Sequence, residues 1–371
     1  MPDLADIVRR HGPAYRQQFG ERMSADQLRV LRDIAVCRTP VLGGQRWCCP
    51  KCGQQRLAFH SCGNRHCPAC GAEDAHAWRD RQQALLLPVP YHLATFTVPD
   101  ALRRTIRSHP RELLALLFRT ASTTLLDLCA NPRWLGATPG VTAVLHTWTR
   151  QLEYHPHVHF LVTGGGVAPD GSWRESDPKF LVPVHALSKV FRARFRDELQ
   201  ARFPDLFAAL PSKTWSSDWV VHSEPVGSGE QALRYLSRYL YRVALSNASL
   251  LRADDQAVTF RYRDSADRRA RTCTLAPHEF LRRFLQHVLP KGFVKARAFG
   301  LHHPSKRGTL TLVRLMLYWH ASRQPPPPAS LTSPVLKPPT CCPRCAAPMA
   351  CVQRLTPLPT LNPLARGPPS T

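Results

Sequence analysis

Acidic side chains are scarce in this 371-residue chain. Asp and Glu together number 26, against 50 Lys and Arg, so the formal net charge is +24 at pH 7. Lysine is scarce as well, because it supplies only 8 of the 50 basic residues. An arginine bias of the genome explains the excess of arginine over lysine but not the missing acids. Such a surplus attracts polyanions over long distances, and arginine suits bidentate contacts with phosphate, so a nucleic-acid partner is predicted.

Long apolar runs are also missing. No stretch approaches the ~18–20 uncharged apolar residues that a helix needs to span a bilayer. The N-terminal sequence MPDLADIVRRHG lacks the apolar core of a secretion signal. We therefore expect a cytoplasmic protein with no membrane partner. In that reducing compartment the 13 cysteines are not expected to form a disulfide framework, and several fall in Cys-x-x-Cys pairs, which indicates metal binding.

The sequence pattern changes twice and predicts three parts. Residues 1–80 begin with helical spacing of apolar side chains and continue into a small segment rich in Cys, Gly and His. Residues 81–322 mix strand-like and helix-like segments with hairpin-like turns, which favours an α+β fold with an antiparallel sheet and packed helices. Residues 323–371 are rich in proline and nearly free of charge and aromatics, so we expect a disordered tail.

Three histidines occupy alternate positions of a predicted strand, HPHVHFLVTG. Because side chains alternate along a strand, His155, His157 and His159 share one face. Neutral imidazoles chelate divalent ions, and Mg²⁺ accepts them when phosphate oxygens and water complete its shell. His146, on the neighbouring predicted strand, is a candidate third ligand. The alternative is that these histidines are simply exposed, or hydrogen-bonded in the core. Three histidines on one strand face make that alternative less favoured.

Two tyrosines stand four residues apart in the predicted helix EQALRYLSRYLYRVAL. Tyr235 and Tyr239 therefore lie one turn apart on one face, and Arg238 and Arg242 extend the same side. Phenols beside guanidinium groups, following a metal-binding strand, fit phosphoryl transfer: the cations would neutralise a scissile phosphate and a tyrosine would attack it. Taken alone, the pair is better explained as ordinary half-buried aromatics of an amphipathic helix.

Two Cys-x-x-Cys pairs in the N-terminal part predict a structural metal site. Cys49 and Cys52 are separated by 14 residues from Cys67 and Cys70. Four thiolates at this spacing can close a tetrahedral zinc site. The sequence therefore predicts a structural Zn²⁺.

Further candidate ligands lie close to these pairs. Cys37, Cys62 and His66 could exchange roles with the four cysteines or build a second site. Arg65 makes the module a candidate DNA reader, although purely structural support is nearly as well favoured. In the tail, the Cys342–Cys345 pair is half of a metal site, to which Cys351 could add one ligand, and this segment is expected to be poorly ordered.

Together these segments resemble the two-tyrosine HUH transposases of the insertion sequence ninety-one family. The similar segments cover most of residues 5–300 in one order. They are ADIVRRHGPAYR, CRTPVLGGQRWCCPKCG, SCGNRHCPAC, VLHTWTRQLEYHPHVHFLVTGGG, WVVHSEP, YLSRYLYRVALSN and FLQHVLPKGFVKAR. The resemblance implies an N-terminal transposase zinc-binding domain, an HUH-endonuclease fold with a central antiparallel sheet, and transposition by a rolling-circle-like route through single-stranded DNA.

The resemblance also assigns roles to residues. By that likeness His157 and His159 are the metal-binding histidine pair. We expect the catalytic ion to be Mg²⁺ or Mn²⁺, and His146 or His155 stays the auxiliary candidate from its strand position. Tyr235 and Tyr239 are the nucleophiles, and their attack leaves a 5′-phosphotyrosine and a free 3′-OH. The implied partner is DNA, chiefly single-stranded or hairpin element ends, and the sequence does not set the oligomeric state. The proline-rich C-terminus departs from the family pattern.

Three alternatives remain beside this interpretation. A plasmid replication initiator or relaxase would share the chemistry, but the cysteine-rich module favours a transposase. A zinc-dependent DNA-binding regulator without catalysis explains the charge and the cysteines but leaves HPHVH and the tyrosine pair without a role. A metallohydrolase would need a carboxylate base near the metal, and Glu153, the only close candidate in sequence, would face away from the histidines.

Overall fold

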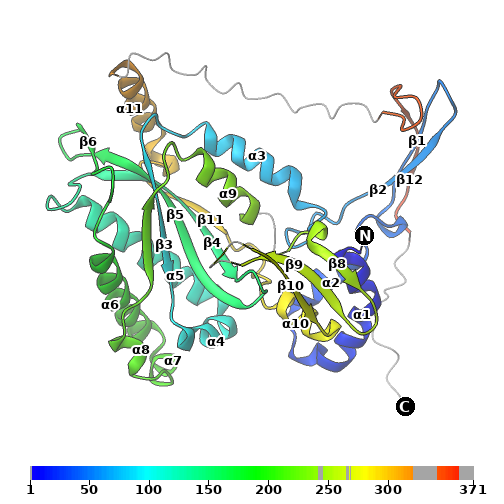
Figure 1. The fold of residues 1–371 in the computed structure, drawn as a ribbon, viewed down its shortest axis with the longest axis horizontal. Coiled ribbons are helices and arrows are strands. Elements are labelled where there is room, and N and C mark those ends of the chain that lie inside the picture. Colours follow the sequence, from blue (N-terminus) through cyan, green and yellow to red (C-terminus); the bar gives the residue numbers. More distant parts are fainter. Residues whose placement is uncertain (1, 241–244, 265–266, 268, 321–340, 359–371) are drawn as a thin grey trace. The chain divides into compact units, whose positions relative to one another are not determined.

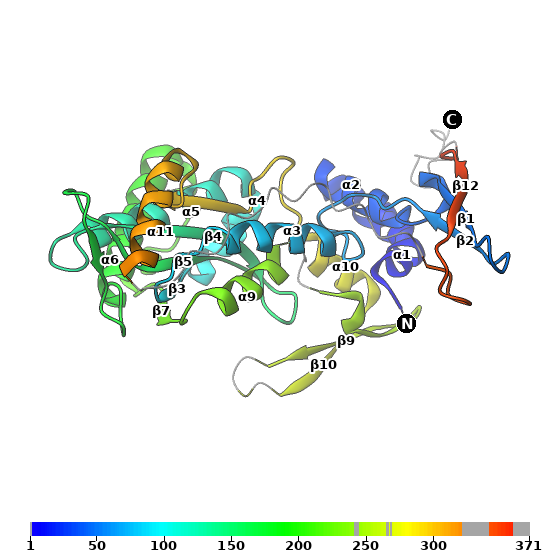
Figure 2. The ribbon, with the colours of Figure 1, turned by 90° about the horizontal axis from the view of Figure 1, so that it is seen from above.

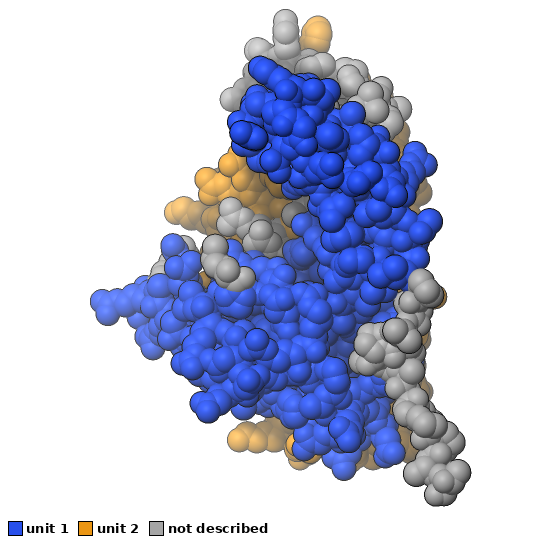
Figure 3. Space-filling view, turned by 90° about the vertical axis from the view of Figure 1, so that its right-hand side faces the viewer, with its two compact units in different colours: residues 1–73, 245–288, 329–371 blue, residues 74–244, 289–328 orange. Residues whose placement is uncertain are grey.

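The chain folds into two units in the computed structural model (Figures 1 and 2), which describes residues 2–240, 245–264, 267, 269–320 and 341–358, without the side chains of residues 72–74 and 238–240. Unit 1 combines residues 1–73, 245–288 and 329–371, and unit 2 combines residues 74–244 and 289–328 (Figure 3). Each unit therefore contains segments that are far apart in sequence.

A six-stranded antiparallel sheet is the centre of unit 2. Its order is β11-β4-β5-β3-β7, and β6 forms an antiparallel pair with β5. The strands are β3 (Tyr91–Thr97), β4 (Thr138–Trp148), β5 (Tyr154–Val167), β6 (Trp173–Glu175), β7 (Val221–Pro225) and β11 (Ala296–Gly300). The longest strand, β5, lies between β4 and β3, so residues on it have strand neighbours on both sides.

Helices cover both faces of this sheet, because the alternating side chains of its central strands are apolar on both sides. Val158 and Phe160 of β5 point into a core with α4 (Asp100–Ser108), α5 (Pro110–Ala130) and α6 (Val184–Arg202). Leu161 points to the opposite face and into a second core. That core includes side chains of α3 (Gly71–Gln83), α9 (Glu230–Leu240) and α11 (Arg307–His320). Two short helices, α7 (Pro204–Ala208) and α8 (Lys213–Ser216), follow α6.

Helix α5 is, among the described helices, the one long and apolar enough to cross a membrane. Most of its apolar residues, among them Leu113, Leu117 and Phe118, are buried in the core that this helix forms with the sheet. Burial of this kind is the ordinary reason for an apolar helix inside a protein core.

Unit 1, in its described residues, is built from three helices and two small sheets. The helices are α1 (Leu4–Phe19), α2 (Ala25–Ala35) and α10 (Pro277–Leu285). One sheet has the order β10-β9-β8 and the other β12-β1-β2. Their strands are β1 (Gly44–Cys48), β2 (Gln55–Phe59), β8 (Leu250–Ala253), β9 (Val258–Arg263), β10 (Ala270–Leu275) and β12 (Ala350–Leu355). Short 3-10 turns in the chain are η1 (Gly20–Arg22), η2 (Pro40–Leu42), η3 (Asn247–Ser249) and η4 (Pro304–Lys306).

The α+β fold class with antiparallel sheets is confirmed, but the expectation for the tail is wrong in one part. Residues 323–340 and 359–371 lie outside the described residues. Residues 341–358 are folded, because β12 pairs in antiparallel register with β1, from Gly44 opposite Leu355 to Cys48 opposite Ala350. The composition of residues 341–358 does not reveal that they pair with β1, a strand some 300 residues earlier in the chain. That pairing orders the segment.

Candidate functional site

Three histidines meet on one face of the central sheet in unit 2. In the β4–β5 pairing His146 stands directly opposite His157, and His159 lies two residues further along the same face. One ring nitrogen from each residue lies within 4.8 Å of those of the other two, which is close enough for one metal ion. The β4–β5 register shifts immediately after His146, and such irregularities are common beside functional sites.

His155, on the same strand, does not join this group. Its Nδ1 accepts a hydrogen bond from the Arg103 guanidinium of α4, with 2.6 Å between the nitrogens. Arg103 also forms an ion pair with Asp100 in the same helix. Of the two auxiliary ligands that the sequence offers, His146 groups with both His157 and His159, whereas His155 does not.

The outer contacts of His157 and His159 orient the two rings. His157 Nδ1 donates to the backbone oxygen of His155 at 2.7 Å, which leaves Nε2 as the basic nitrogen. His159 Nδ1 lies 2.8 Å from the hydroxyl of Thr95 on β3. The Nε2 of His159 is buried and has no hydrogen-bond partner among the described residues. Metal-binding histidines are typically held by the second ring nitrogen in this way, so the donor set fits a divalent ion.

Burial also keeps these imidazoles uncharged. It lowers the pKa of His157 to about 4 and the pKa values of His146 and His159 well below the ordinary value. Repulsion between neighbouring imidazolium charges acts in the same direction, and the positive charge of Lys295 adds to it at His146. All three rings are therefore neutral at pH 7, which is the form that binds a metal.

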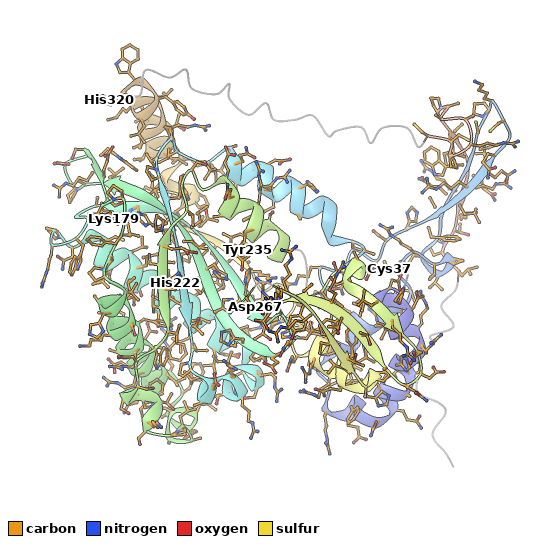
Figure 4. The ribbon with its side chains drawn as sticks, in the orientation of Figure 1. Cys37, Lys179, His222, Tyr235, Asp267 and His320 are labelled. Atoms are coloured by element: carbon orange, nitrogen blue, oxygen red, sulfur yellow. The ribbon has the colours of Figure 1, made fainter. Side chains whose placement is uncertain are left out.

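Helix α9 places Tyr235 beside the histidines. Ala232 and Leu236 of α9 are buried in the core above β4 and β5, so the helix lies against this face of the sheet. The ring centroid of Tyr235 is 5.9 Å from that of His159, at nearly a right angle, and 6.4 Å from that of His146. Tyr235, labelled in Figure 4, is 37% exposed, so solvent can reach it.

The remaining residues predicted on this helix are only partly described. Tyr239 and Arg238 belong to α9 by their backbone, but their side chains lie outside the described residues, as does Arg242 entirely. The structure therefore shows one of the two predicted tyrosines at the histidine cluster.

Two cations near the site were not singled out from the sequence. Lys295 is buried, its ammonium lies 4.4 Å from the centre of the Trp148 ring, and Trp148 stacks on His146 at 5.4 Å. The sequence offered one signal for it, because Lys295 lies in the segment FLQHVLPKGFVKAR. Arg103 had no such signal, since only the fold brings α4 to the start of β5.

The cysteines of unit 1 form two separate groups, and the expected grouping of Cys49, Cys52, Cys67 and Cys70 is wrong. One group joins the second predicted pair to two cysteines earlier in the chain: Cys37, Cys62, Cys67 and Cys70. The other joins the first pair to the C-terminal pair: Cys49, Cys52, Cys342 and Cys345. Each Cys-x-x-Cys pair supplies half of a tetrahedron, and its spacing does not reveal which other half completes it.

The geometry of the first group suits a thiolate-bound metal. The Cys37 sulfur lies 3.5 Å from that of Cys70 and 3.6 Å from that of Cys67. Around zinc at ~2.3 Å, tetrahedral sulfurs lie about 3.8 Å apart. His66 is buried beside Cys67 but is not in the group, and Arg65 is half-buried, with a pKa that burial lowers.

Two family models and two relatives are similar to parts of this chain. A family model described as "Putative transposase" matches residues 140–309, and one described as "Transposase zinc-binding domain" matches residues 7–98. "Putative transposase y4qJ" of Sinorhizobium fredii is 40% identical over 319 residues, 81% of this chain and 80% of that protein. The "Transposase for insertion sequence element IS801" of Pseudomonas savastanoi pv. phaseolicola is 30% identical over 297 residues, 73% of this chain and 70% of that protein. The chain belongs to the transposases of the insertion sequence ninety-one family.

The family confirms the resemblance seen in the sequence and makes this transposase a DNA-processing enzyme. The segment that matches "Putative transposase" begins within β4 and contains β5 and α9, so it includes the three histidines and Tyr235. The zinc-binding segment contains all four cysteines of the first group. No solved structure matches the transposase.

Proposed function

We propose that this transposase nicks single-stranded DNA by HUH-type chemistry, with Tyr235 as a nucleophile and His146, His157 and His159 as ligands of a divalent ion. The position of the Tyr235 ring, 5.9 Å from His159 on the ligand-bearing face of the sheet, is the observation that carries the proposal. A partly exposed phenol beside three neutral imidazoles combines a nucleophile with a metal-ligand set, which is the combination that metal-assisted phosphoryl transfer requires.

The reaction exchanges one phosphodiester for another. The phenol oxygen of Tyr235 attacks the phosphorus, the bond from phosphorus to the 3′ oxygen breaks, and that oxygen leaves as a free 3′-OH after taking up a proton. The 5′ phosphate remains on the tyrosine, so a later attack by a 3′-OH restores a DNA strand and the phenol. A bound Mg²⁺ or Mn²⁺ supplies Lewis-acid charge to the scissile phosphate. Tyr239, one turn further along α9, is the proposed second nucleophile.

Residues around the ligands prepare them for this task. Thr95 and the backbone oxygen of His155 hold the rings with Nε2 available, and burial excludes the protons that would compete with a metal. Lys295 adds a positive charge close to His146. These groups would lower the cost of bringing a phosphate to the buried face.

The other parts of the chain have supporting roles in this proposal. Residues 1–80 carry a structural Zn²⁺ held by Cys37, Cys62, Cys67 and Cys70, residues 81–322 carry catalysis, and the partners are single-stranded or hairpin DNA ends in the cytoplasm. Arg65, Arg238 and Arg242 are proposed DNA contacts.

A covalent adduct tests the nucleophile. Purified full-length protein is incubated with labelled single-stranded DNA from the ends of its own element and Mg²⁺ or Mn²⁺, and denaturing gels reveal protein that carries DNA. We expect an adduct that a chelator prevents. The Tyr235→Phe/Tyr239→Phe double variant should form none while still binding DNA, whereas Tyr318→Phe on α11 should behave as wild type. An adduct that survives the double substitution contradicts the mechanism, and no adduct with any element DNA favours a non-catalytic DNA-binding role.

The metal ligands are tested by the same assay. His159→Ala removes a buried ligand, and we expect a loss of adduct of about 100-fold, the upper end of the roughly 10–100-fold that changes to the groups supporting metal ligands produce. His185→Ala, an exposed change on α6, is the matched control. Equal activity of the two variants would exclude His159 from the catalytic site.

A further inference from the structure

The second cysteine group joins two segments with similar local sequences. Residues 48–53 read CCPKCG and residues 341–346 read CCPRCA. In each, the first cysteine of the Cys-x-x-Cys pair donates its backbone N–H to the oxygen five residues later, from Cys49 to Gln54 and from Cys342 to Ala347. In each, its oxygen accepts from the N–H four residues later, from Gly53 and from Ala346. The two turns therefore have the same backbone hydrogen bonds.

The backbone angles agree with this equivalence. Gly53 has a φ of +71° and Ala346, at the matching position, has a φ of +57°. A left-handed conformation is ordinary for glycine but unfavourable for alanine, by roughly 1–2 kcal/mol. A residue holds such a conformation only when its surroundings require it. Here the requirement is a turn that directs both cysteine sulfurs of the pair to one point.

The four sulfurs converge at the distances of a metal site. The Cys49 and Cys345 sulfurs are 3.5 Å apart, those of Cys52 and Cys342 are also 3.5 Å apart, and those of Cys345 and Cys52 are 3.6 Å apart. All four cysteines are free, and a disulfide would need a separation of about 2.05 Å. The backbone N–H of Arg344 also points to the Cys342 sulfur at 3.4 Å, a contact that stabilises a thiolate.

We propose that Cys49, Cys52, Cys342 and Cys345 bind a second zinc ion, separate from the one held by Cys37, Cys62, Cys67 and Cys70. The site makes residues 341–358 a part of the N-terminal zinc module. Strand β12 completes the sheet β12-β1-β2, and Met349 and Trp47 pack against the cysteines to cover the site. The ion and the strand pairing support each other, since a sheet this small buries too little apolar surface to be stable alone.

Metal content of the full-length protein tests the proposal. Wild-type protein should contain two zinc ions per chain, and the Cys342→Ser/Cys345→Ser double variant should contain one. The Cys341→Ser/Cys351→Ser variant removes two exposed cysteines from the same segment and should keep two. Two zinc ions in the first variant, or one in the wild type, would overturn the second site.

A measurement on the unaltered protein covers the case in which a variant fails to fold. Iodoacetamide followed by peptide mass spectrometry reports which thiols react. Cys341 and Cys351 should be modified at once, while Cys342 and Cys345 should be protected until a strong chelator is added, together with Cys49 and Cys52. Immediate modification of Cys342 and Cys345 in zinc-loaded protein would contradict the proposal. Neither measurement depends on DNA cleavage, so failure of the nicking mechanism would leave the result unaffected.

Discussion

His302 shows what burial does to a single titratable side chain in unit 2. Its ring is almost fully buried, lies 3.2 Å from the Thr142 hydroxyl through Nδ1, and packs on Gly140. Burial lowers its pKa to about 4. The unfolded chain takes up a proton at this histidine below about pH 6.5, whereas the folded chain does not do so until about pH 4. Stability from this residue is therefore complete above pH 6.5 and decreases as the pH falls towards 4.

This difference predicts the effect of one substitution. His302→Gln has no group that titrates in this range, so its melting temperature should fall less than that of the wild type between pH 7.5 and 4.5. The pKa of His302 differs by about 2.5 between the unfolded and the folded chain. At ~1.36 kcal/mol for a pKa difference of one, the wild type loses on the order of 3 kcal/mol of unfolding free energy once the pH has fallen below both values. Thermal unfolding followed by circular dichroism across this range measures it. His185→Gln, on an exposed surface, is the control and should keep the wild-type slope. Equal slopes for all three proteins would show that His302 titrates normally.

At the scale of elements, the start of α9 decides where Tyr235 lies. Gly229 immediately precedes this helix and has a φ of +78°, and a Cβ built there would lie 2.9 Å from Cγ of the fully buried Tyr91 ring. The hydroxyl of Tyr91 accepts a hydrogen bond from the backbone of Leu87, so the ring cannot move aside easily. A side chain at position 229 must therefore shift the start of α9.

Gly229→Ala should consequently lower adduct formation and stability together. Gly227→Ala is the matched control, because Gly227 also has a positive φ, +62°, but a Cβ added there would meet no atom within 4 Å. The Gly227 variant should lose only the roughly 1–2 kcal/mol of unfolding free energy that a positive φ costs an alanine. The Gly229 variant should lose a further ~1–3 kcal/mol from overpacking and at least tenfold in adduct rate. Chemical denaturation and the adduct assay measure the two effects, and equal losses would show that the Tyr91 ring does not position α9.

Local patterns predict elements better than they predict partners between elements. The alternation in HPHVH places His157 and His159 on one face because that period belongs to the strand itself. The choice between His146 and His155 depends on strand register and on Arg103, which the sequence does not show. Cysteine spacing reveals the half-sites in the same way, but their pairing depends on β12 reaching β1.

At the scale of the whole chain, the positive charge is distributed unevenly. Residues 43–60 and 341–358 contain no Asp or Glu. They carry exposed basic side chains at Lys51, Arg56, Arg344 and Arg354. In unit 2, by contrast, exposed arginines such as Arg196 and Arg202 of α6 have acidic partners within the same helix. The zinc module with its C-terminal strand is thus the better candidate for sequence-independent contact with DNA phosphates.

Reversing two of these charges should show whether the module holds DNA. Arg344→Glu/Arg354→Glu should weaken binding to single-stranded DNA, and the slope of log affinity against log salt should fall by about 1.4, or ~0.7 for each phosphate that the variant no longer neutralises. The Arg196→Glu/Arg202→Glu variant changes the net charge by the same amount and should leave the slope nearly unchanged. Fluorescence anisotropy over a salt series measures both. If both variants shift the slope equally, the DNA responds to total charge, and the C-terminal strand serves only to complete the zinc module.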